Sequence, residues 1–207
     1  MISFFDKKQE KNMRMKPPPW GNEETQKILD ILEKYNIKAT FFVTGEWVRK
    51  YPKDVKKIAE AGHDLGNYSE HYKNMKGLSE EECRREIMEV HQKVKALTGV
   101  EMNLFRCPHG EYDNEMMKNV TNCGYYPIQW SVDSLDWKDY GAESIIQTVC
   151  DHTELKNGAI ILMRNGAKYT ADSLEQMILE IQKKGFQIVP VSELIYYEND
   201  HMDEQRK

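Results

Sequence analysis

The feature of this sequence that most constrains its fold is the alternation of short apolar runs with longer amphipathic segments. The apolar runs are rich in Ile, Val and Phe and show little polar alternation, which is typical of strands buried on both faces. They cover residues 38–44, 63–68, 103–107, 126–132, 159–163 and 186–190, and a weaker run covers 2–5. Because helical segments separate most of these runs, the pattern predicts β-α-β crossovers and a parallel sheet.

The helical segments follow from the spacing of their apolar residues. The clearest covers 79–97, where apolar side chains recur at steps of three and four and form one stripe. Ser79 and Glu82 have the spacing of a capping box, and Gly99 follows the expected end. Further helices are predicted over 23–35, 113–122, 143–152 and 172–184.

The number of strand–helix units indicates an unusual barrel. Seven units in 207 residues are too few for a complete eightfold barrel, which typically needs ~250 residues. We therefore predict an α/β fold, a distorted and incomplete (β/α)7 barrel with a parallel sheet. The predicted domain covers 20–197. An atypical N-terminal segment, 1–19, which contains the weak strand and an insertion, precedes it, and a polar tail, 198–207, follows it.

Composition excludes several classes of protein. The chain has 29 Lys and Arg against 34 Asp and Glu, and this net charge of -5 argues against a nucleic-acid partner. No stretch approaches the ~20 apolar residues that a membrane span needs. The first twenty residues lack the apolar core of a secretory signal, so we expect a cytoplasmic protein. The four cysteines lack C-x-x-C spacing, which disfavours a zinc knuckle.

Unusual residues follow the predicted strands, at the ends where active groups gather in such folds. The stretches are GNYSEHY at 66–72, FRCPHG at 105–110, WSVDSLDW at 130–137 and ILMRNG at 161–166. Together with KATFFV at 38–43 and GHDLGN at 62–67, their order and spacing resemble the polysaccharide deacetylase family, the NodB-homology carbohydrate esterases of family 4. The resemblance extends from about Trp20 to Leu194. It is strongest to the spore-forming bacterial branch, because Trp20-Gly21-Asn22 precedes the first helix.

The resemblance implies a metal-assisted hydrolysis of acetylated glycans, such as peptidoglycan, chitin oligomers or acetylated xylan, at the cell envelope or in spores. In the family, one Asp and two His hold zinc or another divalent ion, which activates water. A neighbouring Asp removes the water proton, and a His in the last motif protonates the departing amine. An Arg orients the base, and a second Asp pairs with the His.

Several of these roles are lost when the family motifs are carried over to this chain. The two metal-binding His positions hold Tyr68 and Tyr72, whose phenols are poor ligands for a divalent ion. The general-acid position holds Arg164, which keeps its proton at ordinary pH. Asp6 is the candidate for the catalytic base, but residues 7–19 separate it from Trp20-Gly21-Asn22. The metal-binding Asp has no counterpart. We therefore expect no metal cofactor.

Other family positions are retained. Arg106 matches the Arg that orients the base in the family. Asp133 matches the Asp that pairs with the catalytic His. Because Arg164 replaces that His, we predict an ion pair between Asp133 and Arg164. The predicted glycan-binding residues are Tyr68, Tyr72, Pro108, Gly110, Trp130, Trp137 and Leu162, the last of which matches the residue that contacts the acetyl methyl group.

Structural interpretations of the same residues remain open. The alternative interpretations are ordinary packing for Tyr68 and Tyr72, a structural role for Arg106, and capping of the following segment by Asp133 and Asp136. A displaced metal site at His63 and His71 is disfavoured, since these residues flank a strand at opposite ends. A nucleophilic Cys107 is disfavoured because no base has a specific relation to it.

Three functional hypotheses follow from these substitutions. The favoured one is a catalytically inactive homologue that binds N-acetylated glycan, such as cell-wall polysaccharide, or acts as a scaffold. The second is a deacetylase that works with an altered site. The third is the remnant of a gene copy with a damaged start region. The favoured hypothesis rests on the concentration of the substitutions in three catalytic roles, while the periodicity of the core is retained.

Overall fold

The structure is a computed structural model that describes residues 21–195. Over this range, the strands form two parallel sheets. The larger has the order β1-β2-β3-β4, with β1 at Thr40–Val43, β2 at Asp64–Asn67, β3 at Leu104–Phe105 and β4 at Tyr126–Pro127. The smaller pairs β5, Val132–Asp133, with β6, Ile161–Leu162. The predicted α/β fold with parallel strands is confirmed, and the predicted strand at 2–5 lies outside the described residues.

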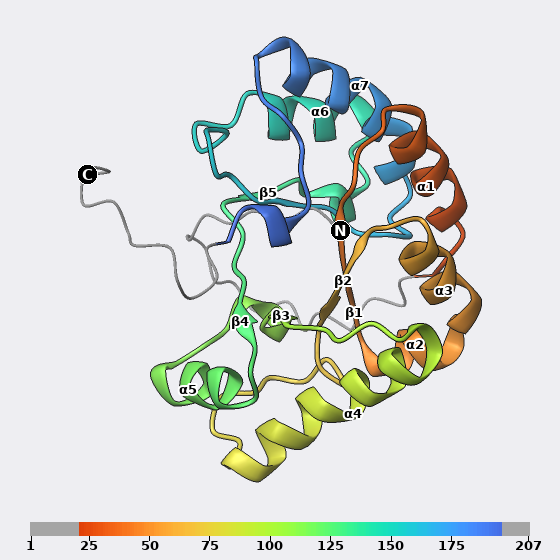
Figure 1. Ribbon diagram of the computed structural model, residues 1–207. Coiled ribbons are helices and arrows are strands. Elements are labelled where there is room, and N and C mark those ends of the chain that lie inside the picture. The colour runs from red at the N-terminus through yellow and green to blue at the C-terminus, as the bar shows by residue number, and fades with distance from the viewer. Residues whose placement is uncertain (1–20, 196–207) are drawn as a thin grey trace.

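Helices surround these strands, as Figure 1 shows. They are α1 (Thr25–Lys34), α2 (Gly45–Lys50), α3 (Pro52–Glu60), α4 (Glu80–Thr98), α5 (Asn114–Asn122), α6 (Ala142–Cys150) and α7 (Thr170–Lys183). Short 3-10 helices occupy Pro108–Gly110 (η1), Asp136–Lys138 (η2) and Val191–Glu193 (η3). Within the described range, no helix combines the length and the apolar character needed to cross a bilayer.

Helix α4 forms as its end signals predict. The Ser79 hydroxyl accepts from the Glu82 amide, and the Glu82 carboxylate accepts from the Ser79 amide, which completes the capping box. Gly99 ends the helix in the left-handed conformation, with φ of 76°, which glycine adopts without steric cost.

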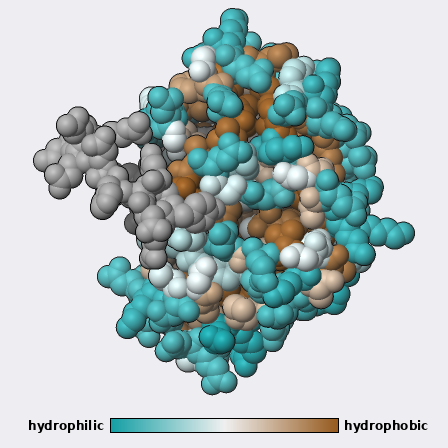
Figure 2. All heavy atoms as spheres, in the orientation of Figure 1, coloured by the Kyte–Doolittle hydropathy of each residue, from teal (hydrophilic) through white to brown (hydrophobic). Residues whose placement is uncertain are grey.

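The larger sheet is buried on both faces, which explains its unalternated apolar strands. Phe41 and Phe105 pack in the main core between sheet and helices. Their neighbours Phe42 and Leu104 point to the opposite face and pack in a second cluster with Ile128 and Val191. Both faces therefore require apolar residues. On the molecular face drawn in Figure 2, hydrophilic side chains cover most of the surface.

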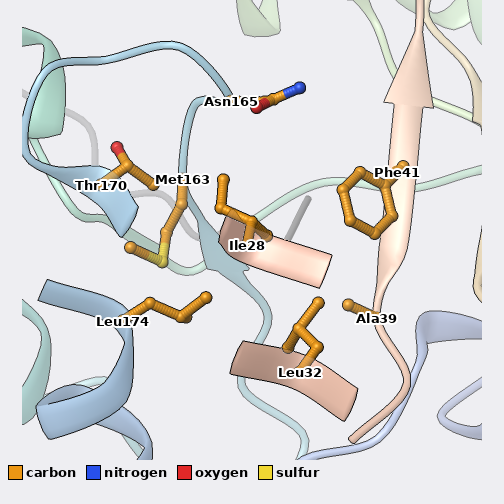
Figure 3. Close-up of a pocket in the computed structure, with 8 residues that line it drawn as sticks. All are labelled: Ile28, Leu32, Ala39, Phe41, Met163, Asn165, Thr170 and Leu174. Atoms are coloured by element: carbon orange, nitrogen blue, oxygen red, sulfur yellow. The ribbon is translucent and has the colours of Figure 1, made fainter. Parts of the chain in front are cut away.

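A small cavity of about 30 Å³ lies between α1, β1 and α7 (Figure 3). Most of its lining is apolar and belongs to the main core, including Ile28, Phe41 and Leu174, and the Asn165 side chain lies at its edge. The residues predicted to form the glycan site do not line it. The cavity is therefore a packing gap in the layer between sheet and helices, separate from the candidate site.

Two sequence predictions about strands were wrong. The predicted strand at 126–132 is divided, because the Ile128 amide donates to Phe105 in the larger sheet and the Ser131 amide to Ile160 beside the smaller one. The chain thus changes partners between β4 and β5. Residues 186–190 form no strand, and η3 follows. There, the Val191 amide donates to the Thr40 hydroxyl instead of joining a backbone ladder.

The sequence indicates a helix that stops at Gly62, but no bounds were predicted for the helical region at 45–60, although its other end signals are in the sequence. The Thr44 hydroxyl caps α2 by accepting from the Trp47 amide at 3.2 Å. Pro52 begins α3, where its fixed φ and missing amide proton suit the first helical position. These two short helices carry the chain from β1 to β2 and complete the first crossover.

Candidate functional site

The side chain of Arg164 forms an ion pair with Asp133, as the sequence analysis predicted. Arg164 follows β6, and Asp133 ends the adjacent β5, where it is paired with Leu162. Both terminal nitrogens of the guanidinium donate to the carboxylate, Nη1 to Oδ1 at 2.7 Å and Nη2 to Oδ2 at 2.9 Å. This two-point contact fixes the plane of the guanidinium as well as its position.

A second carboxylate, Asp136, completes the contacts of Arg164. Nη1 also donates to Asp136 Oδ1 at 2.8 Å, and the Arg164 amide donates to Oδ2 at 2.6 Å. The Thr170 hydroxyl donates to the same oxygen at 2.7 Å, and Asp136 is fully buried. Burial alone would lower the pKa of Arg164, but hydrogen bonds and charges from Asp133 and Asp136 raise it above its ordinary value. Arg164 therefore keeps its proton and cannot act as a general acid.

Tyr68 and Tyr72 lie together beyond the end of β2. Their hydroxyl oxygens are 3.5 Å apart, and their rings meet edge to face with centroids 4.9 Å apart. Burial raises the pKa of the Tyr68 phenol well above its usual value, so this group remains neutral. The ring of Tyr72 also packs against that of His109, 4.7 Å away, and His109 Nε2 lies 3.2 Å from the Tyr72 carbonyl oxygen.

The loop that carries the two tyrosines has a strained backbone. Ser69 and Tyr72 have φ of 65° and 52°, and the facing His109 has φ of 60°, all in the left-handed region. Local hydrogen bonds hold this shape, since the Ser69 amide donates to Asn67 Oδ1 and the Tyr72 amide to Ser69 Oγ. Strain of this kind persists only where the surroundings impose it, and it concentrates at functional sites.

The same loop is attached to α4 through a buried carboxylate. Glu86 is 2% exposed and accepts hydrogen bonds from the His71 amide at 3.0 Å and from Lys73 Nζ. Its other contact is His71 Nδ1 at 2.8 Å. Burial alone would raise the pKa of Glu86, but the hydrogen bonds from His71 and Lys73 lower it overall. Glu86 therefore acts as a charged anchor for the tyrosine loop.

Arg106 lies directly after β3 and is fully buried. Its amide donates to the Asn67 carbonyl, which continues the pairing of β2 and β3. The guanidinium carbon lies 3.7 Å from the centre of the Phe42 ring and 5.6 Å from that of Trp130. Among the described residues, its Nε, Nη1 and Nη2 atoms have no hydrogen-bond partner. Burial lowers the pKa of Arg106 to about 9, and the nearby charge of Arg164 acts in the same direction.

The remaining predicted site residues differ in exposure. Pro108 and Leu162 are buried, and Trp130 is 7% exposed, so its indole lies inside the protein beside Arg106. Gly110 is close to Trp130, because a side-chain carbon at this position would lie 2.9 Å from the ring. The predicted catalytic Asp6 lies outside the described residues.

Trp137 is exposed, and the structure adds two neighbours that the sequence analysis did not select. Trp137 is 39% exposed and Tyr140 is 74% exposed. Lys138 Nζ lies 5.5 Å from the centre of the Trp137 ring and 5.9 Å from that of Tyr140. Leu135 and Asp139, which flank η2, have φ of 54° and 55°. The sequence signal that could have found these two neighbours is the short spacing of Trp137 and Tyr140 around Lys138.

The described residues do not fit a catalytic divalent ion. Over residues 21–195, no three His, Cys, Asp or Glu side chains form a group that could hold a metal. The two His positions of the family hold phenols, which offer no lone pair comparable to that of imidazole. His63 accepts from the Ala39 amide at 3.1 Å, and His71 contacts Glu86, so a displaced site does not form there.

The structure also argues against a nucleophilic cysteine. Cys107 is 5% exposed, and burial raises the pKa of its thiol to about 12. A thiol with such a pKa is protonated at neutral pH and is a weak nucleophile.

Comparison with known proteins identifies the family. The polysaccharide deacetylase family model matches residues 5–128, so this chain belongs to that family. The chain is 34% identical over 171 residues to a peptidoglycan-N-acetylglucosamine deacetylase of Bacillus cereus, covering 81% of this chain and 62% of that protein. It is 35% identical over 176 residues to the uncharacterized protein YlxY of Bacillus subtilis, covering 85% and 54%. The chain therefore spans less than two thirds of the length of either relative.

Solved structures of the same family include one without activity. The fold is similar to that of BA3943 from Bacillus anthracis, described as a CE4 family pseudoenzyme, with a TM-score of 0.79 and 30% identity. The match covers 86% of this chain and 62% of that one. A BA3943 mutant described as having restored enzymatic activity matches with a TM-score of 0.79 and 31% identity, covering 84% and 63%.

Proposed function

We propose that this protein is a catalytically inactive polysaccharide deacetylase homologue that binds N-acetylated glycan. The observation that carries the proposal is the contact of Arg164 with Asp133 and Asp136. At the position of the general acid, a permanently protonated guanidinium is held by two carboxylates. It cannot deliver a proton to a departing amine, because its own pKa is raised.

The loss of the metal ligands supports the same conclusion. Hydrolysis of an acetamide in this family depends on an ion that polarises the carbonyl and activates water. A catalytic zinc ordinarily has three protein ligands, whereas Tyr68 and Tyr72 supply neutral phenols. The substitutions remove the ion and the acid together, while the strand ends that shape the site are retained. The existence of a pseudoenzyme with the same fold is consistent with this proposal.

The exposed aromatic residues support glycan binding. Trp137 and Tyr140 are exposed, and Trp137 lies beside the Arg164 site, since η2 contains both Asp136 and Trp137. Sugar rings have apolar faces that pack on aromatic side chains, and an amphipathic Trp or Tyr contributes large contact area with few rotatable bonds. Lys138, between the two rings, adds a donor for sugar hydroxyl or carbonyl oxygens.

Binding and hydrolysis should be measured separately. An N-acetylglucosamine hexamer should bind, as measured by calorimetry, and release no amine after prolonged incubation with added zinc. The Trp137→Ala variant should bind about tenfold more weakly. Leu179→Ala is the matched control, because Leu179 is an exposed apolar residue, 47% accessible, on α7. Chelator-sensitive amine release would contradict the proposed inactivity, and equal weakening by both variants would contradict the glycan site.

A further inference from the structure

A chain of hydrogen bonds connects the molecular surface with the tyrosine loop. At its outer end, His91 Nε2 on α4 lies 2.9 Å from Oε2 of the exposed Glu101. The other ring nitrogen, Nδ1, lies 2.6 Å from the Tyr125 hydroxyl. Asn67 Nδ2, at the end of β2, donates to the same hydroxyl at 3.2 Å, and Asn67 Oδ1 accepts from the Ser69 amide at 3.0 Å. These contacts form one continuous path from Glu101 to the loop.

The inner end of this path has a fixed hydrogen-bond direction. A backbone amide can only donate, so the Ser69 amide requires the oxygen of the Asn67 side chain as its acceptor. The nitrogen of that side chain also donates to the Ile87 carbonyl at 2.8 Å. The Asn67 amide group is therefore held in one orientation, in which it is a donor toward the Tyr125 oxygen.

The outer end has a fixed direction as well. Hydrogen bonds from Lys95 and His91 lower the pKa of Glu101, so its carboxylate is ionised at neutral pH and can only accept. His91 Nε2 must then carry a proton. Because a neutral imidazole has one N–H group, Nδ1 is an acceptor, and the Tyr125 hydroxyl donates to it. With neutral His91, every donor of the path thus faces an acceptor.

Protonation of His91 disrupts this match. A protonated imidazole donates from both nitrogens, so Nδ1 competes with Asn67 for the Tyr125 oxygen, and the phenol proton loses its acceptor. The phenol cannot release that proton instead, because burial raises the pKa of Tyr125. His91, Tyr125 and Asn67 are only 8%, 3% and 0% exposed, and an unsatisfied polar group is costly at such a position. One of the contacts in the path must therefore break.

We propose that protonation of His91 at mildly acidic pH releases the tyrosine loop through Tyr125 and Asn67. The longest contact of the path joins these last two residues, and once it breaks, the Asn67 side chain can turn and leave the Ser69 amide. Ser69 has a φ of 65°, which persists only while its surroundings impose it. Imidazole is the side chain whose ordinary titration falls between pH 5 and 8. The inference goes beyond the proposed function, because it concerns the conformation of the loop.

The other charged groups around this path do not change between pH 5 and 8. Lys95 pairs with Glu101, and both stay charged. Cys123 lies near Tyr125, and burial raises the pKa of its thiol, which stays neutral. The remaining groups are held in ion pairs between α4 and its neighbours, and they are Arg49, Glu70, Lys73, Glu86 and Lys93.

Two further histidines touch the loop but do not release it. His71 Nδ1 lies 2.8 Å from the buried Glu86 carboxylate, so a positive charge on His71 strengthens this anchor. His109 Nε2 lies 3.2 Å from the Tyr72 carbonyl oxygen. A carbonyl can only accept, so this nitrogen donates whether the ring is neutral or protonated. Loosening of the loop by acid is therefore expected from His91 and from neither of these residues.

The first test follows the Ser69 amide of the full chain by NMR between about pH 7.5 and 5.5. Its protection factor, the intrinsic exchange rate divided by the observed one, should fall about fivefold or more on acidification. The Ser69 resonance should shift over the same pH interval as the ring carbons of His91. In His91→Gln, whose neutral amide can accept from Tyr125 and donate to Glu101, the protection factor should not depend on pH.

His71→Asn is the matched control, because it removes an imidazole from the loop itself, and it should keep the pH dependence of the wild type. Tyr125→Phe removes the shared phenol and gives a second test that does not depend on how well His91→Gln folds. Its Ser69 amide should be weakly protected at both pH values. Wild-type protection that is independent of pH, or a pH dependence that persists in His91→Gln, would show the inference to be wrong.

Affinity for the N-acetylglucosamine hexamer is a separate readout, and it rests on the proposed function. Because the released loop carries Tyr68 and Tyr72, wild-type affinity should fall on acidification, and that of His91→Gln should not. If no hexamer binds at either pH, the proposed function is wrong, while the change in Ser69 protection still supports release of the loop. If the hexamer binds and Ser69 protection is independent of pH, the proposed function stands and the inference fails.

Discussion

The guanidinium of Arg164 contacts Asp133 through both terminal nitrogens, at 2.7 and 2.9 Å, across the neighbouring ends of β6 and β5. The two residues are 31 positions apart in the chain and meet because their strands are parallel partners. By the resemblance of the motifs, this ion pair lies where the family's general acid and its carboxylate partner would stand. In the proposed function, a permanent electrostatic contact therefore stands in place of a proton-transferring pair.

The buried acid of this cluster should matter for stability. Asp136→Ala removes a fully buried carboxylate that accepts from Arg164 and Thr170. Breaking a buried ion pair leaves a charge without compensation, so we expect a loss of about 3–5 kcal/mol in the free energy of unfolding in urea. Asp172→Ala, which breaks an exposed pair with Lys27, is the control and should cost about 0–1 kcal/mol. Equal losses in the two variants would contradict this account.

Stability should also depend on pH through His63. Burial lowers the pKa of His63 to about 4, and its Nδ1 accepts from the Ala39 amide. Because the unfolded chain protonates this group near its ordinary value of 6.5 and the folded chain does not, stability should fall as pH drops from about 6.5 to 4.

The His63→Asn variant isolates this titration, because the amide oxygen can replace Nδ1 as acceptor. The difference in unfolding free energy between pH 7 and pH 5 should be smaller in this variant than in the wild type. His152→Asn is the control, since His152 also accepts a backbone amide, that of Glu154, through Nδ1. A pH dependence that His63→Asn leaves unchanged would exclude this group as its origin.

Restoring imidazoles should restore affinity for a metal. In the double variant Tyr68→His, Tyr72→His, two neighbouring phenols become ligands with lone pairs at neutral pH. We expect zinc affinity to increase at least about tenfold over the wild type, measured by competition with a chromogenic chelator. The pair Tyr112→His, Tyr140→His adds the same number of imidazoles at exposed positions and should gain less. Similar gains in both pairs would indicate nonspecific binding.

The tyrosine loop should loosen when its anchor is removed. Glu86→Ala deletes the carboxylate that holds His71 and Lys73, so amide exchange over residues 69–73 should accelerate. The cost in unfolding free energy should be about 1–3 kcal/mol, because the groups left behind reach solvent. Glu89→Ala, at an exposed position of the same helix, should change neither quantity. If amide exchange over residues 69–73 is unchanged in Glu86→Ala, contacts other than those of Glu86 order the loop.

Local sequence signals predicted much of the fold, because they act over a few residues. The stripe from Cys83 to Leu97 with its capping residues predicted α4, and apolar runs located the centres of four strands, β1, β2, β3 and β6. Such signals failed where distant partners decide the structure. Residues 126–132 were predicted as one strand, but their backbone bonds to two different sheets. The run at 186–190 is followed by Val191, whose amide bonds to the side chain of Thr40.

The sequence by itself determined the parallel α/β architecture, the identity of the residues at the strand ends and the loss of the family's imidazoles. Only the tertiary structure decided how those residues pair. Asp133 and Asp136 both turn to Arg164, while Arg106, a residue with the same charge, is left between Phe42 and Trp130. The physical reason is that hydrogen bonds and buried charges depend on distances of a few ångström. Spacing along a chain does not specify such distances until the strands are packed.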